Sequence, residues 1–171
     1  GTGQYAYDSS GNGNTGRLGT STSAEPADPT WTTGKLGKGL SFDGVNDYVG
    51  MGNVLDFERT SSFTVSAWVK RGATGTTQII ASKMLNSGTY RGWNVWFFSD
   101  NTIHFILRNT VETSQLQPVT ANTFSSTANW YYVTVTYNGN SLASGVNFYV
   151  NGVLQAQGTP LYNNLSATTI T

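Results

Sequence analysis

The chain has 171 residues, of which only 11% are charged, and its nine basic residues balance its nine acidic ones. This neutrality argues against a nucleic-acid footprint or a polybasic membrane patch. The absence of cysteine excludes disulfides, thiolate metal ligands and cysteine nucleophiles. No apolar stretch approaches the roughly 20 residues that span a bilayer. The length predicts a single domain over residues 1–171, with a substantial core.

Strand patterns follow one another along the chain, and helical periodicity is almost absent. Residues 17–38 are predicted to form a loop, because they include Pro26, Pro29 and several glycines. Residues 40–49 are predicted to form a strand, a turn and a strand. Alternation of apolar and polar residues predicts further strands over 62–70, 77–84, 92–99, 101–109, 129–139 and 146–158.

Two turn signals join pairs of these strands. Residues 99–101 predict a tight hairpin, and Asn151-Gly152 is the dipeptide that best tolerates the positive φ angles of a type I′ turn. Seven or eight strands without helices predict an all-β fold, either a β-sandwich or a closed barrel. Aromatic residues make up 13% of the chain and fall mostly on the predicted strands, where they would fill the core.

The order of several motifs resembles that of a known family. In chain order the motifs are YDSSGNGNTGRL, PTWTTGKLGKGLSFDGVNDYV, SSFTVSAWVKR, NWYYVTVTYNG and FYVNGVL. Over about residues 5–155 this order resembles the laminin-G-like, concanavalin A-like jelly-roll domain of secreted bacterial proteins. The resemblance implies a two-sheet antiparallel jelly-roll sandwich. It also implies a non-catalytic module within a larger secreted or cell-surface protein.

The sequence departs from this family at both ends. Family members usually begin with a W-x-F-D-E-type strand and end with an I-D-E-V-type acidic strand, and neither motif is found in this sequence. A sheet that lacks a strand exposes unpaired backbone groups to β-augmentation. We therefore expect another chain or segment to complete the sheet.

A calcium site is suggested by the opening loop. Asp8, Ser10 and Asn12 offer oxygens at alternate positions, and Asp43 and Asp47 of the FDGVNDYV segment offer two further carboxylates. The family resemblance implies that such an ion is held partly by this loop and partly by the acidic last strand. The alternative is a plain turn closed by the Asp8 side chain. Both interpretations stay open.

The residues of the chain give little support for a catalytic function. The three glutamates, Glu25, Glu58 and Glu112, do not form the E-x-D-x-x-E pattern of glycosidases with this fold. His104 is the only histidine, and the chain has no G-x-S-x-G elbow. We expect His104 to be an ordinary half-exposed strand residue, and the chain to have no catalytic residue.

A glycan-binding patch is suggested by the segment 90–108. If Trp93, Val95 and Phe97 point inward, the side chains between them share the other face. An exposed aromatic ring beside amide and cationic groups suits a sugar ring. The candidate ligand-binding residues are Tyr90, Asn94, Trp96, His104 and Arg108. The alternative is that Trp96 belongs to the core.

Two functions remain after these exclusions. The first is a non-catalytic binding or adhesion module that recognises a glycan or extracellular matrix at a bacterial cell surface. The second is a structural subunit of an extracellular filament or surface layer, with a protein partner or a second copy joined through exposed sheet edges. Both functions place the protein outside the cell, with calcium as its only expected cofactor.

Overall fold

Alternation of apolar and polar residues builds the long strands of the computed structural model, which describes residues 2–169. In β6 (Phe63–Lys70), Phe63, Val65 and Val69 pack against the core, and the alternate residues Thr64, Ser66, Trp68 and Lys70 are exposed. The chain forms two compact units, residues 1–54 and 55–171. The prediction of one domain stays a prediction.

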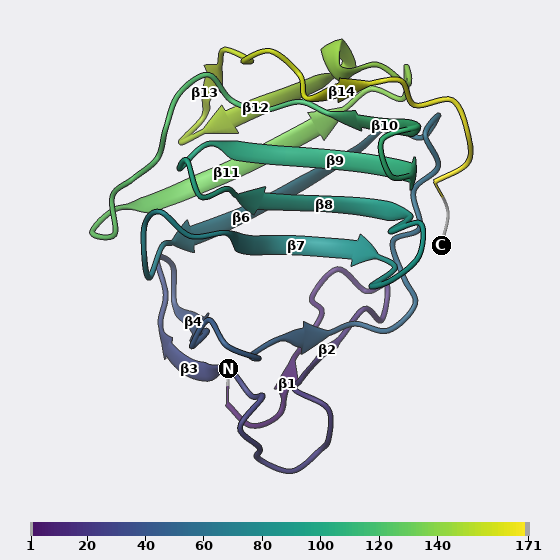
Figure 1. Ribbon diagram of the computed structural model, residues 1–171. Helices are drawn as coiled ribbons and strands as arrows, with labels where there is room; N and C mark the ends of the chain where they lie inside the picture. Colours follow the sequence, from purple (N-terminus) through teal and green to yellow (C-terminus); the bar gives the residue numbers. More distant parts are fainter. Residues whose placement is uncertain (1, 170–171) are drawn as a thin grey trace. The chain divides into compact units, whose positions relative to one another are not determined.

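The unit of residues 55–171 contains two antiparallel sheets that lie face to face (Figure 1). The four-stranded sheet has the order β13-β12-β11-β6, and the five-stranded sheet has the order β14-β10-β9-β8-β7. Besides β6, the strands are β7 (Gln78–Met84), β8 (Gly92–Phe97), β9 (Ile103–Thr110), β10 (Ser114–Gln117), β11 (Trp130–Tyr137), β12 (Val146–Val150), β13 (Val153–Gln155) and β14 (Tyr162–Asn163). A 3-10 turn, η1 (Ala143–Gly145), precedes β12.

The core lies between these two sheets. Trp93, Val95 and Phe97 of β8 point into it, as the alternation predicted. Other strands contribute fully buried side chains in the same way: Ile103, Phe105, Leu107, Leu116, Val146 and Phe148. Apolar residues on the two inner faces therefore make a sheet-on-sheet core, which confirms the predicted all-β sandwich.

The predicted hairpins are present. Asn151 and Gly152 join β12 to β13 with φ angles of 53° and 80°, as a type I′ turn requires. Residues 98–102 join β8 to β9, and Asn101 has a φ of 70°. Local turn chemistry thus identified both connections correctly.

The unit of residues 1–54 contains shorter strands. β1 (Tyr5–Ala6), β2 (Gly16–Leu18) and β5 (Val49–Gly50) form one sheet, and β3 (Thr30–Thr33) pairs with β4 (Lys38–Ser41). The prediction that residues 17–38 form a loop was wrong for residues 17–18, 30–33 and 38, which belong to β2, β3 and β4. β1, β2 and β3 escaped notice because strands of two to four residues are too short to show alternation. β4 and β5 overlap the strand, turn and strand predicted over residues 40–49. Among the described residues, no helix is long and apolar enough to cross a membrane.

Candidate binding face and carboxylate clusters

The five-stranded sheet has a second face, which points away from the core. Because Trp93, Val95 and Phe97 point inward, the intervening side chains of β8 point outward. The same alternation applies to β9 and β10. We define the outer face by Asn94, Trp96, His104, Ile106, Arg108, Gln115 and Gln117.

Strand register decides which of these side chains are neighbours. Trp96 lies opposite His104 on the adjacent strand, and Asn94 lies opposite Ile106. Arg108 lies opposite Gln115, beside a register shift between Ser114 and Gln115. Side chains in such cross-strand pairs are close enough to interact. The structure therefore brings four of the predicted ligand-binding residues onto one face: Asn94, Trp96, His104 and Arg108.

Two of these residues are less accessible than the sequence predicted. Trp96 is 8% exposed, and His104 is 3% exposed rather than half-exposed. Their ring centroids are 5.2 Å apart, and the ring of Phe98 lies 4.8 Å from His104 on another side. The rings cover one another, so an open Trp96 platform was a wrong expectation.

Hydrogen bonds hold His104 in place. The Gln117 amide nitrogen donates to Nδ1 of His104 at 3.1 Å. Nε2 of His104 lies 2.9 Å from the Thr102 hydroxyl, and this hydroxyl donates to the Asp100 carboxylate at 2.5 Å. Burial lowers the pKa of His104, although the Asp100 carboxylate opposes this shift. His104 is therefore neutral at pH 7, and both ring nitrogens are engaged within the protein.

Arg108 is the cation of the outer face. Its Nε donates to the side-chain oxygen of Gln115, which is fully buried. Burial lowers the pKa of Arg108, while the neighbouring Tyr162 hydroxyl on β14 opposes this shift. Arginine nevertheless keeps its charge in proteins. The outer face therefore carries a partly buried positive charge.

Two polar atoms of the outer face have no hydrogen-bond partner among the described residues. They are Oδ1 of Asn94 and Nε2 of Gln115, and both atoms are buried. A buried polar group without a partner costs roughly 1–3 kcal/mol. Such groups are uncommon in folded proteins and call for an explanation. Both atoms lie on the face that holds Arg108.

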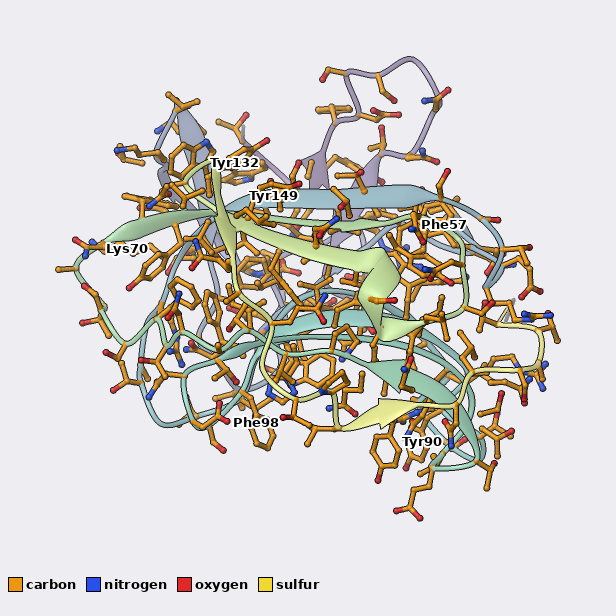
Figure 2. All side chains as sticks on the ribbon, turned by 90° about the horizontal axis from the view of Figure 1, so that it is seen from above. Phe57, Lys70, Tyr90, Phe98, Tyr132 and Tyr149 are labelled. Carbon is orange, nitrogen blue, oxygen red and sulfur yellow. The ribbon has the colours of Figure 1, made fainter. Side chains whose placement is uncertain are left out.

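Aromatic rings stand at the two ends of β8. Tyr90 is 42% exposed and Phe98 is 39% exposed. Figure 2 shows them well apart, on the side of the sandwich opposite Tyr132 and Tyr149 of the four-stranded sheet. Tyr90 lies two residues before Gly92, whose cross-strand partner is Arg108. Of these two rings, Tyr90 is the one at the Arg108 end of β8.

The predicted calcium residues form two separate turns. Asp8 accepts backbone hydrogen bonds from Ser10 at 2.7 Å and from Asn14 at 2.8 Å, and Ser10 Oγ accepts a hydrogen bond from the Asn12 side-chain amide at 3.1 Å. The bond from Ser10 is the main cause of a lowered Asp8 pKa.

In the second turn, Asp43 donates its backbone N–H to Asp47 at 2.7 Å and accepts one from Val45 at 2.8 Å. Within residues 2–169, no three acidic or histidine side chains gather around a common point. The carboxylates of both turns are thus already occupied by backbone N–H groups.

A different pair of carboxylates converges beside Gly19. Asp28 Oδ2 accepts hydrogen bonds from the Gln4 amide at 2.8 Å and from Glu25 N at 2.9 Å, whereas Oδ1 is buried without a partner. A Cβ atom built on Gly19 would lie 2.2 Å from that Oδ1, 2.5 Å from Glu25 Oε1 and 3.2 Å from the Ala27 carbonyl oxygen. Three oxygens therefore surround one small space.

Sequence reasoning missed several of these residues. Gln115 and Gln117 flank the inward Leu116, and this alternation over 114–117 was a usable signal for a short strand with both amides on one face. Tyr162 lies on a two-residue strand and gave no signal. Glu25 was considered only as a catalytic residue, and the spacing of the three glutamates excluded that role. Its convergence with Asp28 depends on how that loop folds.

The comparisons with known proteins point to one superfamily. The family model of the concanavalin A-like lectin/glucanases superfamily matches residues 43–170. No curated protein and no solved structure matches this sequence. The family match spans most of the chain and agrees with the two-sheet antiparallel fold, and it confirms the laminin-G-like resemblance. The chain belongs to the concanavalin A-like lectin/glucanases superfamily.

Proposed function

We propose that this protein is a non-catalytic extracellular binding module, and that its outer face on the five-stranded sheet binds a glycan. The superfamily includes lectins, which makes carbohydrate the first ligand class to test. The observation that carries the proposal is Arg108, a partly buried guanidinium, together with the exposed ring of Tyr90 at the same end of β8. Sugar rings stack on exposed aromatic rings, and their hydroxyls accept hydrogen bonds from a guanidinium.

The side chains of the outer face favour binding over hydrolysis. Glycoside hydrolysis usually needs two carboxyl groups on either side of the scissile bond. The residues that define the outer face include amides, rings and a guanidinium, but no carboxylate. We therefore place adhesion or glycan recognition, at a bacterial surface or on extracellular matrix, ahead of an enzymatic role.

Tyr90 provides the first test of this proposal. We expect glycan binding by the whole chain to be saturable in titration calorimetry. We expect Tyr90→Ala to weaken it by about three- to tenfold, because the variant loses one accessible aromatic face. Tyr132→Ala is the matched control, since Tyr132 is a partly exposed tyrosine on the other sheet. Equal losses in the two variants, or cleavage of the glycan, would contradict the proposal.

A second candidate function is assembly with a protein partner or a second copy. It is favoured by β6, an eight-residue end strand of the four-stranded sheet that is paired there with β11 alone. Long end strands can accept a further strand. Sedimentation velocity over a wide concentration range tests this function. A single species at every concentration, together with glycan binding, would leave only the first function.

We also propose that calcium binds as a structural ion at the Glu25–Asp28 cluster. Calcium prefers carboxylate and carbonyl oxygens, and Asp28 Oδ1, Glu25 Oε1 and Ala27 O converge there. The buried, unpartnered Asp28 Oδ1 distinguishes this cluster from the Asp8 turn, because Glu25 Oε1 and the Asp8 carboxylate oxygens all accept backbone hydrogen bonds already. A cation would neutralise a carboxylate oxygen that is otherwise costly to bury.

Matched variants distinguish the Glu25–Asp28 cluster from the Asp8 turn as the calcium site. Trp31 borders the same cleft as Glu25 and Asp28, so bound Tb³⁺ can be followed by its sensitised luminescence and displaced with Ca²⁺. We expect Asp28→Asn to weaken binding at least about tenfold, because the site loses one of its two carboxylates. We expect Asp8→Asn to leave it nearly unchanged. The reverse result would restore the Asp8 loop as the site, and no binding in any variant would reject calcium.

A further inference from the structure

A positive charge on the outer face lacks a countercharge. Lys83 pairs with Asp56, whereas no carboxylate is found beside Arg108 among the described residues. Arg108 is partly buried, and its guanidinium hydrogen-bonds through Nε to a neutral amide, Gln115. A buried charge without a partner of opposite sign is costly. The folded protein therefore carries a cation that an anionic ligand could neutralise.

The orientation of this cation is set by the protein. Gln115 is fully buried, and its backbone is tied to Asn164 by hydrogen bonds of 3.0 and 2.9 Å. Because Gln115 engages Nε, the guanidinium plane is fixed while its terminal amino groups have no acceptor among the described residues. The two terminal amino groups of a guanidinium form a planar fork, which matches the two oxygens of a carboxylate. Gln115 acts here as a positioning residue.

The groups around Arg108 suit the binding of a saccharide. Tyr90 offers an exposed ring near the Arg108 end of β8, and Tyr162 lies on β14, which is on the other side of β9 in the strand order. The outer face itself holds no carboxylate that would repel an anion. A ring to stack on and a charged fork together suit a sugar that carries a carboxylate.

From these observations we infer that the outer face selects acidic saccharides, and that Arg108 pairs with the carboxylate of a uronic acid residue. This inference rests on the proposed glycan-binding function and specifies its ligand class. It predicts that charge on the ligand matters more than the remaining sugar contacts. A carboxylate paired with the fixed fork gains two charge-assisted hydrogen bonds, which are stronger than neutral ones.

The test compares each acid with its own methyl ester. Oligosaccharides of galacturonic acid and of glucuronic acid are titrated calorimetrically into the whole chain, each beside its fully methyl-esterified form. We expect at least one acid to bind at least about tenfold more tightly than its ester, because the ester loses the charge-assisted pair. We expect Arg108→Gln to remove this difference. Lys70→Gln, which removes an exposed lysine of the other sheet, should preserve it.

The outcomes separate this inference from the function on which it rests. Equal binding of acid and ester in both series would overturn the inference, while glycan binding would stand. An acid preference that survives in a folded Arg108→Gln variant would also overturn it. If no saccharide binds, neutral or acidic, both proposals fail. The comparison of acid with ester needs no variant, so it remains decisive even if Arg108→Gln does not fold.

Discussion

Replacing Arg71 by methionine is expected to lower the free energy of unfolding by about 3 kcal/mol or more. Arg71 is only 3% exposed, and its guanidinium lies 4.7 Å from the centroid of the Phe97 ring. It donates hydrogen bonds to the side chains of Gln78 and Asn101 and to the backbone oxygens of Thr76 and Phe124. Methionine fills similar space but leaves these acceptors without their donor.

Hydrogen bonds to a charged group contribute more than neutral ones, and their buried partners are costly to leave unsatisfied. The segments that Arg71 joins are distant in sequence: the connection before β7, the turn before β9 and the chain near Phe124. Urea unfolding followed by tryptophan fluorescence measures the effect. Lys70→Met, at the exposed neighbouring position, is the matched control and should change stability by no more than about 0.5 kcal/mol. Similar losses in the two variants would contradict this account.

Replacing Gly92 by alanine should cost about 3 kcal/mol or more, for a different reason. Gly92 begins β8 with a φ of 126°, a conformation that side chains rarely adopt. Its added Cβ would lie 2.0 Å from the carbonyl oxygen of Lys83 and 2.8 Å from the Cα of Met84. Both atoms belong to the backbone of β7, so the strand itself would have to move.

Gly88 provides the control for this second prediction. Its φ of 69° is also positive, but a Cβ there meets no atom within 4 Å. Gly88→Ala should therefore cost only about 1–2 kcal/mol, the penalty of the left-handed conformation alone. The difference between the two variants in urea unfolding isolates the contact with β7. Since Gly92 pairs with Arg108, a shift of β8 should also weaken the binding of any ligand beside Arg108. Equal costs would show that the backbone contact is unimportant.

The main strands were predictable because their signal is local. In β11, Tyr131, Val133, Val135 and Tyr137 alternate toward the core as the sequence predicted. The Asn151-Gly152 turn was predictable for the same reason, because two adjacent residues determine its backbone angles. The short strands β1, β2, β3, β10 and β14 were missed because alternation needs more residues than they contain.

The outer face was predictable only in part. Alternation placed Asn94, Trp96, His104 and Arg108 on the same side of their strands, and the structure agrees. It could not show that Trp96 and His104 would cover one another, because burial depends on neighbours from the next strand. The pairing of Arg108 with Gln115 depends on register beside a bulge, which leaves no mark in the sequence.

By itself, the sequence of this protein determined the all-β class, the inward residues of the long strands and the superfamily, because each depends on short-range pattern or motif order. The tertiary structure alone decided which polar groups meet. It placed an uncompensated Arg108 against Gln115, and it brought Asp28 and Glu25 together beside Gly19. The physical reason is that strand register and loop closure join residues far apart in the chain, whereas local pattern sets only the direction of each side chain.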